Sequence, residues 1–426
     1  MSIDPNGDWQ ARLAQIVDLM RTMSQQTDPQ EMVRTYAEKV RGLIHNDRRI
    51  SLSRRGLASP MYRITRSTTW SEEINPWREK DRLPLLEGGL LADLIYGDEP
   101  VVIDDLDVSP SDPAAEYLAG QRSLTAIPMY DQGVSLNMVV VMRKEPAAFI
   151  RDELPQMVWI TNLFGRATSN LVLSDELQRA NQALDREMRA VGAIQRALLP
   201  AKLPKVPTLD LAAYYQPSQR AGGDYYDFFP LPGGRLGIFI ADVSGHGSPA
   251  AVLMAVTHCI AHTNPGDMQP PARVLDYLNR QLTLLYTAQI ESFVTAFYGV
   301  YDPERRTLTY ACAGHNPPRL KRCSDGTLLS LDRVGGFPLG VTDDARYEEH
   351  VQQLVPGDEL ILYTDGVTEA ANPHGKLFGA EGLDRVLENC SLRASALLDT
   401  VLDEVSAFAD GQPAHDDRTL IVARVL

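Results

Sequence analysis

The stretch Leu236-Gly-Ile-Phe-Ile-Ala-Asp242-Val-Ser-Gly-His-Gly247 decides the fold of the C-terminal half of the chain. The apolar run before the aspartate is typical of a strand buried in a sheet. A glycine-rich turn follows, and then a predicted helix that begins near Pro249. A carboxylate at the edge of a buried strand is costly to remove from water unless it is paired or bound to a metal ion. Asp242 is therefore a candidate functional residue.

The same arrangement recurs at three further places. Asp365 follows Leu360-Ile-Leu-Tyr-Thr364, the pair Asp416 and Asp417 precedes Arg418-Thr-Leu-Ile-Val422, and Asp224 lies just ahead of Phe228-Phe229. One such aspartate is most often a turn or helix-cap residue, but several together favour a common site. Carboxylate and carbonyl oxygens without thiolates are hard ligands, which suit Mg²⁺ or Mn²⁺. Two such ions would ionise a bridging water and neutralise charge on a phosphoryl group.

Around these carboxylates, the region from about Leu209 to Leu426 alternates predicted strands with predicted helices. The strands are expected at Leu236–Val243, Phe293–Tyr301, Thr307–Ala313, Glu359–Thr364 and Thr419–Leu426. The helices are expected at Ala250–Thr263, Pro271–Ala288, Ala380–Asn389 and Arg393–Ala409. Strand pairs followed by helix pairs predict an α/β sandwich and not a doubly wound parallel sheet.

The N-terminal region, residues 8–170, has a different pattern. Two amphipathic helices are expected first, the second over Pro29–Leu43. Short strands are then expected at Arg49–Ser53, Met61–Arg66, Pro100–Ile103, Ser123–Tyr130 and Val134–Arg143. Asp131-Gln132-Gly133 predicts a hairpin turn between the last two strands. This order of elements predicts a small α+β domain with one antiparallel sheet.

Residues 171–199, between these regions, predict one long helix, since the segment has no Pro and a single Gly. Apolar residues recur every seven positions, at Leu177, Leu184, Val191 and Leu198. This repeat favours a coiled coil that joins two copies of the chain, and packing of the stripe on a neighbouring domain is the alternative. Pro200 and the prolines after it end the helix. The predicted catalytic domain then occupies residues 200–426.

The composition excludes several classes of protein. A length of 426 residues suggests two or three domains, and 44% hydrophobic with 23% charged residues is ordinary globular usage, not that of a disordered chain. The formal net charge is −15, which disfavours nucleic acid or a membrane surface as the primary partner. No apolar run approaches the ~20 residues of a membrane span. The polar N-terminus is unlike a signal peptide, and we expect a cytoplasmic protein.

The four cysteines show no CxxC spacing and are too few for a disulfide framework in a chain of this length. They are Cys259, Cys312, Cys323 and Cys390. We expect all of them to be buried thiols in a reducing compartment.

Six ordered motifs resemble one family, the SpoIIE/RsbU class of PPM-type metal-dependent Ser/Thr phosphatases. They are Gly222-Gly-Asp-Tyr-Tyr-Asp227, Asp242-Val-Ser-Gly-His-Gly247, Ala313-Gly-His-Asn-Pro-Pro318, Gly336-Phe-Pro-Leu-Gly340, Tyr363-Thr-Asp-Gly-Val-Thr-Glu369 and Asp416-Asp-Arg-Thr-Leu420. The resemblance covers roughly residues 195–426 and implies a β-sandwich flanked by helices with two Mn²⁺ or Mg²⁺ ions. Gly222-Gly-Asp alone also resembles the motif of diguanylate cyclases, but Tyr225 and Tyr226 depart from that motif and the other five have no place in that fold.

Carried over position by position, the resemblance implies a metal role for several residues. Asp242 would bridge both ions, the Val243 carbonyl and Asp224 would serve the second ion, and Asp365 and Asp416 would serve the first. These four aspartates are the expected catalytic residues. Two further residues, Asp417 and His246, are expected next to the ligands and not among them. A structural role is favoured for His246 and His315 over general acid catalysis.

The N-terminal region resembles a GAF-type sensory domain in the order of its elements, with a small molecule or a protein as its expected signal. By resemblance, the substrate is a phosphorylated STAS-domain protein, an antagonist of an anti-sigma factor. The leading interpretation is a phosphatase controlled by this sensor through the helix. One alternative is a signalling scaffold that binds an anti-sigma-like kinase or a STAS protein. Another is a small-molecule sensor with the phosphatase only as its output.

Overall fold

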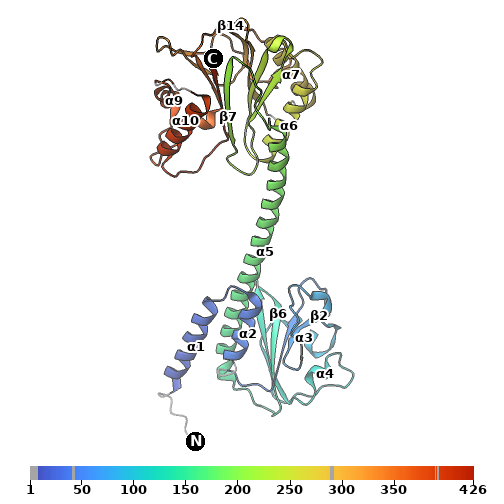
Figure 1. Cartoon of the computed structure of the whole chain (residues 1–426). Helices are drawn as coiled ribbons and strands as arrows, with labels where there is room; N and C mark the ends of the chain where they lie inside the picture. Colours follow the sequence, from blue (N-terminus) through green and yellow to red (C-terminus); the bar gives the residue numbers. More distant parts are fainter. Residues whose placement is uncertain (1–7, 41–43, 288–291, 389, 391–392) are drawn as a thin grey trace. The chain divides into compact units, whose positions relative to one another are not determined.

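The computed structural model describes residues 8–40, 44–287, 292–388, 390 and 393–426 (Figure 1). The chain divides into two compact units, Met1–Asn181 and Gln182–Leu426. Helix α5, Leu154–Leu198, contributes its first part to the first unit and its last part to the second. The helix expected over residues 171–199 is therefore the C-terminal part of a longer one, which begins beside Pro155 and ends before Pro200.

The first unit contains one antiparallel sheet with the strand order β3-β2-β1-β6-β5-β4. Its strands are β1 Arg48–Ser53, β2 Met61–Ser67, β3 Leu85–Glu87, β4 Val101–Ile103, β5 Ser123–Asp131 and β6 Val134–Arg143. The predicted hairpin is confirmed: Asp131 pairs with Val134, and Gln132 and Gly133 between them have φ of 52° and 84°. Two positive φ values give a turn whose twist matches that of the strands.

Helices cover both faces of this sheet (Figure 1). On one face, α1 Asp8–Ser24, α2 Pro29–Val40 and the start of α5 pack on Ile127, Val139 and Val141. On the other, α3 Gly89–Gly97 and α4 Ala115–Leu118 pack on a second apolar cluster. The last residues of the helix expected over Pro29–Leu43 lie outside the described residues.

The second unit contains two antiparallel sheets. One has the order β14-β11-β10-β9-β8 and the other β13-β12-β15-β16-β7. The first is formed by β8 Tyr225–Pro230, β9 Leu236–Val243, β10 Val294–Asp302, β11 Thr307–Ala313 and β14 His350–Gln353. The second is formed by β7 Leu209–Gln216, β12 Arg319–Lys321, β13 Leu328–Ser330, β15 Glu359–Tyr363 and β16 Arg418–Val425.

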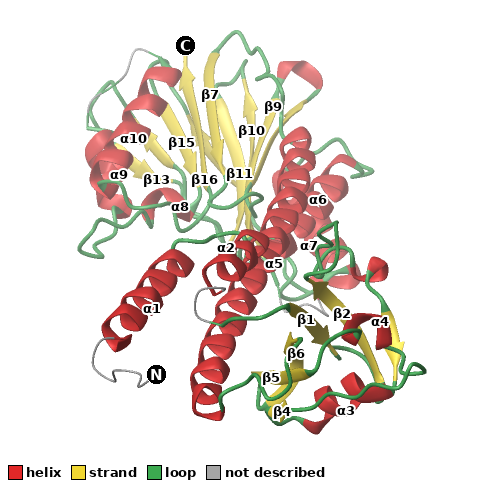
Figure 2. Ribbon diagram, turned by 90° about the horizontal axis from the view of Figure 1, so that it is seen from below, coloured by secondary structure: helices red, strands yellow, loops and turns green. Residues whose placement is uncertain are grey.

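The two sheets lie face to face and helices cover their outer faces (Figure 2). Helices α6 Ser248–His262 and α7 Pro271–Leu285 share the core of the first sheet. Helices α9 Gly379–Val386 and α10 Ala394–Ala409 pack on the second sheet, and the short α8 Asp365–Thr368 follows β15. The α/β sandwich predicted for this region is confirmed.

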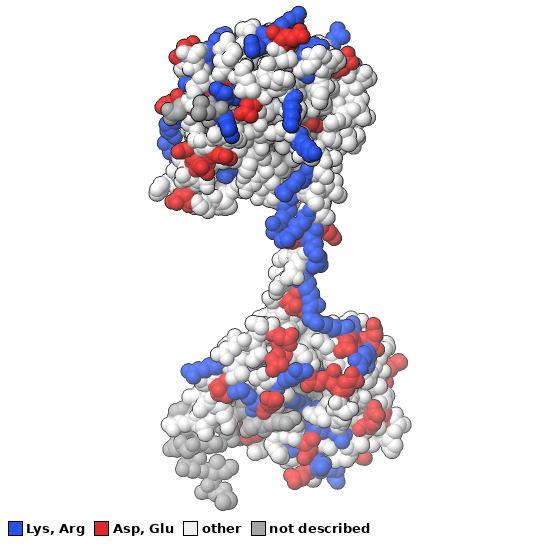
Figure 3. Space-filling view, viewed as in Figure 1, with Lys and Arg blue, Asp and Glu red and all other residues white. Residues whose placement is uncertain are grey.

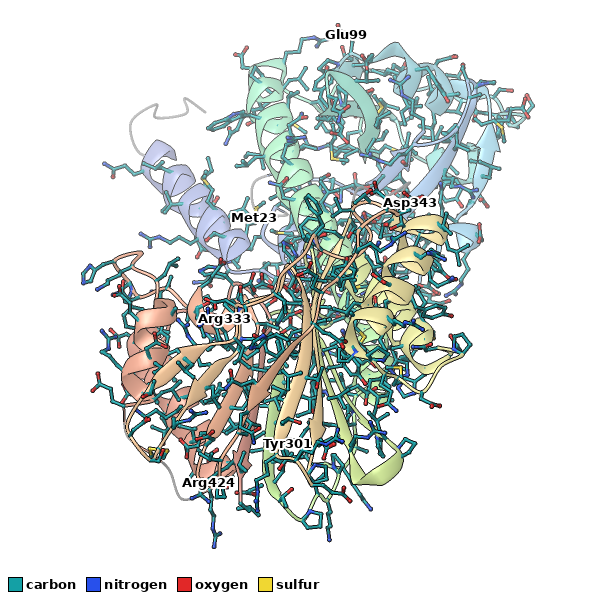
Figure 4. All side chains as sticks on the ribbon, turned by 90° about the horizontal axis from the view of Figure 1, so that it is seen from above. Met23, Glu99, Tyr301, Arg333, Asp343 and Arg424 are labelled. Atoms are coloured by element: carbon teal, nitrogen blue, oxygen red, sulfur yellow. A yellow bond between two sulfur atoms is a disulfide. The ribbon has the colours of Figure 1, made fainter. Side chains whose placement is uncertain are left out.

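One end of the sandwich carries the aspartates singled out in the sequence. Tyr301 pairs with Leu236 at the start of β9, and Arg424 pairs with Glu359 at the start of β15. Tyr301 and Arg424 lie at the opposite end of the sandwich from Arg333 and Asp343 (Figure 4). Since Asp242 and Asp365 lie at the far ends of β9 and β15, they occupy the end of the sandwich away from Tyr301 and Arg424.

The prediction of four buried thiols is wrong for three of the cysteines. Cys323 and Cys390 form a disulfide with Cα atoms 5.9 Å apart, although 67 positions separate them in the sequence. Cys259 is exposed and Cys312 is buried. Cys323 follows β12 and Cys390 follows α9, so the fold brings the pair together and spacing in the sequence could not indicate it.

Among the described residues, no helix combines the length and the apolar character that crossing a membrane requires.

Candidate metal centre

Strand β9 places Asp242 at the centre of the first sheet. The strand is hydrogen-bonded on both sides, to β8 and to β10, and Asp242 is its second-last residue, opposite Thr295. The other seven residues of β9 are all buried. The pairing with both neighbours holds the register, and a slip of one residue would place a side chain where Gly237 makes room for the Tyr298 ring. The fold therefore holds Asp242 in one place.

Asp365 and Asp416 come from neighbouring strands of the second sheet. Asp365 begins α8 directly after β15, and Asp416 lies two residues before β16. The two strands pair in antiparallel fashion, with Tyr363 opposite Leu420, so the end of one meets the start of the other. This pairing brings the two carboxylates to the same end of the sheet.

Asp224 connects the two sheets. It precedes β8 of the first sheet and is buried, and its Oδ2 accepts hydrogen bonds from Oγ1 of Thr364 at 2.7 Å and Oγ1 of Thr419 at 2.6 Å. Both threonines belong to the second sheet, because Thr364 follows β15 and Thr419 lies in β16. Two donors on one oxygen orient the carboxylate and leave Oδ1 for another partner.

The four carboxylates act on one another electrostatically. Burial, and then the charges of Asp365 and Asp416, raise the pKa of Asp242 to about 8. Burial and the charge of Asp416 raise the pKa of Asp365 to about 6. The pKa of Asp224 lies well above its usual range because of burial and the charge of Asp242. Like charges this close are costly, and a bound cation relieves the cost.

The Val243 carbonyl lies against Gly223, the residue before Asp224. A Cβ at Gly223 would meet the Val243 oxygen at 2.8 Å, which is closer than side chains tolerate. Glycine therefore permits this approach. The donor set of carboxylate and carbonyl oxygens fits a hard divalent cation. In the described residues, two groups of three potential ligand side chains have their ligand atoms within 4.8 Å of one another, and neither group includes these four aspartates. Ligands shared by two ions ~3.5–4 Å apart need not converge on one point.

Asp417 has a different task from Asp416. Its Oδ1 accepts hydrogen bonds from the backbone N–H of Ser218 at 2.7 Å and its hydroxyl at 3.1 Å, and its Oδ2 accepts the N–H of Gly223 at 2.5 Å. A Cβ at Gly222 would overlap Asp417 Oδ2. The buried Asp417 carboxylate thus holds the Ser218–Gly223 loop that leads to Asp224.

The two histidines of the motifs contact polar side chains other than the proposed ligands. His246 is exposed, and its Nδ1 is 3.1 Å from Nε2 of Gln219. Burial raises the pKa of Asp416, and His246 is near enough to oppose part of that rise. His315 is buried, its Nδ1 is 2.8 Å from Oγ1 of Thr295, and burial lowers its pKa to about 4. His315 therefore supports β10 behind Asp242 as a neutral side chain.

Similar proteins identify the family. The model of Stage II sporulation protein E (SpoIIE) matches residues 232–426. Phosphoserine phosphatase RsbU of Bacillus subtilis (strain 168) is 33% identical over 248 residues, which are 58% of this chain and 72% of the relative. The chain belongs to the SpoIIE/RsbU family of PPM-type phosphatases. It is a protein serine/threonine phosphatase, and enzymes of this family depend on divalent metal ions.

Two further relatives agree with this membership. Phosphoserine phosphatase RsbP of Bacillus subtilis is 30% identical over 163 residues, or 38% of this chain and 40% of the relative. The solved SiaA-PP2C domain of Pseudomonas aeruginosa superposes with a TM-score of 0.51 at 22% identity, over 58% of this chain and 99% of that domain. The likeness to the SiaA-PP2C domain shows the fold of the second unit.

Sequence reasoning missed the side chains that position this SpoIIE-type centre. Thr364 and Thr419 lie inside the quoted motifs, one position before Asp365 and two positions after Asp417, and this proximity was the available signal. Gln195 of α5 had no such signal, since it lies in the stretch interpreted as a dimer helix. Its Nε2 donates to the Gly222 carbonyl at 2.5 Å, and its Oε1 accepts the Gly222 N–H at 2.9 Å.

Proposed function

We propose that the chain is a regulated bacterial phosphatase that hydrolyses phosphoserine or phosphothreonine in a protein with the help of two Mn²⁺ or Mg²⁺ ions. One observation carries this proposal: four aspartates from both sheets meet at one end of the sandwich, where burial and the neighbouring carboxylates raise the pKa of Asp242, Asp365 and Asp224. Buried and half-buried carboxylates this close together are costly without a cation, and they suit a cation-dependent reaction.

The residues divide into those that would hold the ions and those that position them. Asp242 would be shared by both ions, Asp365 and Asp416 would serve the first, and Asp224 with the Val243 carbonyl would serve the second. When bound, the ions supply an ionised water as nucleophile and neutralise charge on the phosphoryl group. The chain itself keeps the ligands oriented by the two threonine hydroxyls on Asp224 and the Asp417 contacts with its loop.

The substrate we propose is a phosphorylated STAS-domain protein of a partner-switching pathway. Support comes from the relatives RsbU and RsbP, both named phosphoserine phosphatases, and from the family motifs. In this pathway the chain would remove the phosphate from a separate phosphoprotein, and loss of that phosphate would be the signal.

We propose further that the first unit is a GAF-like sensor. It contains a cavity of about 800 Å³ on the α2 and α5 face of its sheet. The lining includes Arg66, whose guanidinium lies 5.4 Å from the centre of the Trp77 ring, and Tyr36 and Phe164, whose rings stack at 3.8 Å. Aromatic and arginine side chains together suit a small molecule with a planar or anionic group.

Helix α5 would carry the sensor state to the metal centre. Its first part lines the cavity with Phe164 and Thr168, and its last part holds the Gly222 peptide through Gln195. Near that contact, Gly192 lies against the Arg220 carbonyl, and Arg220 forms an ion pair with Asp185 at 2.7 Å. A shift or rotation of α5 would therefore displace the loop that ends in Asp224.

The same helix would join two copies of the chain. Leu177, Leu184 and Ile194 have 63%, 57% and 67% of their surface exposed, which is unusual for a row of large apolar side chains. Arg side chains follow the visible side of α5 (Figure 3), as expected for the solvated part of a helix that pairs through another side. A homodimer would cover the apolar row.

A comparison of substrates tests this function. Full-length protein with Mn²⁺ is assayed for phosphate release from a phosphoserine STAS protein, from the phosphopeptide of the same site, and from an aryl phosphate. We expect the highest kcat/KM for the folded STAS protein. Binding of that protein without phosphate release would favour a scaffold and contradict the proposal. Faster turnover of the peptide than of the folded protein would contradict the substrate class alone.

A further inference from the structure

A second group of metal-ligating side chains lies between β8 and α6, apart from the aspartate centre. Asp227 belongs to β8, the edge strand of the first sheet, and His258 and His262 lie one turn apart on α6. One ligand atom from each of the three residues lies within 4.8 Å of the others. The His262 Nε2 is 2.7 Å and the His258 Nδ1 3.8 Å from the same oxygen, Asp227 Oδ2.

The surroundings hold these side chains in place. Asp227 Oδ1 accepts the N–H of Phe228 at 2.7 Å, and Oδ2 accepts the Tyr225 hydroxyl at 2.7 Å. The Tyr225 hydroxyl is also 3.2 Å from His258 Nδ1. The Phe228 bond to Oδ1 fixes the carboxylate from outside, as outer hydrogen bonds do for metal ligands, and leaves Oδ2 facing the two imidazoles. His258 Nδ1 would exchange its contact with the Tyr225 hydroxyl for the ion.

The group is reachable from solvent, mainly at His262. The exposed fraction of the side chain is 9% for Asp227, 17% for His258 and 46% for His262. An ion could therefore enter past His262 and keep water in its remaining positions.

The chemistry of this group differs from that of the aspartate centre. Two imidazole nitrogens and one carboxylate oxygen form a borderline donor set, which suits Zn²⁺ and related transition metals and not Mg²⁺. Two histidines four residues apart on one helix face are a recurrent zinc-binding arrangement. We infer that Asp227, His258 and His262 bind one transition-metal ion of the Zn²⁺ class.

The position of this ion gives it an effect on the fold. It would tie α6 to the edge strand, whose single neighbour in its sheet is β9. Asp227 is three positions beyond Asp224, and α6 begins five positions beyond Val243. The ion would thus stabilise two segments that leave the aspartate centre, and it would raise the unfolding temperature by mass action.

The test uses full-length protein in saturating Mg²⁺, which occupies oxygen sites and leaves imidazole sites free. Co²⁺ is titrated as a spectroscopic substitute for Zn²⁺, and its visible absorption reports nitrogen ligation. We expect the wild type to bind one equivalent of Co²⁺ saturably. His258→Gln and His262→Gln should each lose more Co²⁺ affinity than the roughly 10–100-fold that removal of an outer-shell partner costs. Zn²⁺ should raise the unfolding temperature of the wild type and not of His262→Gln.

Three matched variants separate this site from other sources of binding. His374→Gln removes an exposed histidine, Cys259→Ser removes the exposed thiol beside His258, and Asp365→Asn alters the aspartate centre. All three should retain the Co²⁺ spectrum. His262 is nearly half exposed, so His262→Gln should fold, which circular dichroism verifies. Absence of saturable Co²⁺ binding, or binding that survives both histidine variants, would overturn the inference.

Discussion

Gln195 of helix α5 forms two hydrogen bonds with one peptide, that of Gly222: its amide donates to the carbonyl at 2.5 Å and accepts the N–H at 2.9 Å. Gln195 is buried and Gly222 lies two positions before Asp224. The side chain of a helix that also belongs to the first unit therefore satisfies both polar groups of the loop that carries a proposed metal ligand.

Gln195→Ala should weaken both the fold and the metal centre. The variant leaves a buried N–H and C=O without partners, which costs about 1–3 kcal/mol of unfolding free energy per group. The Mn²⁺ concentration for half-maximal phosphate release should rise roughly 10–100-fold, as for loss of an outer-shell partner. Gln182→Ala, at an exposed position of the same helix, is the control. Equal metal dependence of the two variants would contradict the role of Gln195.

Thr419→Val should shift the pH dependence of phosphate release toward higher pH. The hydrogen bond from Thr419 favours the ionised form of Asp224 and so lowers its pKa. Loss of the bond raises this pKa, and a higher pH is then needed to deprotonate the ligand before it binds metal. Thr400→Val, on the exposed side of α10, should leave the pH profile unchanged. A profile that moves to lower pH in Thr419→Val would show that the hydroxyl does not act on Asp224.

His315 should make the fold acid-sensitive. Its pKa is about 4 in the folded chain against an ordinary 6.5, so the unfolded chain binds the proton first. The contribution of neutral His315 is complete above pH 6.5 and is lost as the pH falls toward 4, by up to roughly 3 kcal/mol. Chemical denaturation between pH 7 and 4 should show a smaller decline in His315→Asn than in the wild type. If the stability of His315→Asn declines as steeply as that of the exposed-site variant His374→Asn, His315 is not the source of the acid sensitivity.

Leu177→Asp combined with Leu184→Asp should convert a dimer to a monomer. Two buried charges in a coiled-coil seam cannot be compensated, while both leucines are exposed within one chain. Sedimentation equilibrium measures the mass, and Gln178→Asp at an exposed position beside the row is the control. A wild-type protein that sediments as a monomer would remove the dimer from the proposal.

Much of the second unit could be predicted because its central strands carry strong local signals. The bounds of β9 and β11 agree with those expected from their apolar runs, and the six motifs placed the aspartates at strand ends. Strands β12 and β13 were missed because three residues are too few for a periodic pattern. Edge strand β7 was missed because its sequence, Leu-Asp-Leu-Ala-Ala-Tyr-Tyr-Gln, has no β-branched residue.

The supporting contacts of the site were beyond sequence reasoning for a different reason. The bonds from Thr364 and Thr419 to Asp224 span 140 and 195 positions, and the disulfide spans 67. No local pattern encodes which distant segments meet. Asp416 and Asp417 have the same side chain and adjacent positions, and they are distinguished by the burial of Asp417 and by its hydrogen bonds with the Ser218–Gly223 loop.

The most direct test of the central claim is Mn²⁺-dependent phosphate release by full-length wild type, Asp365→Asn and the exposed-site control Asp343→Asn on a phosphoserine STAS protein. We predict turnover that requires Mn²⁺ in the wild type and the control. Asp365→Asn should lose activity by more than the roughly 100-fold expected for an outer-shell partner and still bind the substrate protein. Undiminished turnover in Asp365→Asn, or turnover in the wild type without divalent metal, would contradict the account.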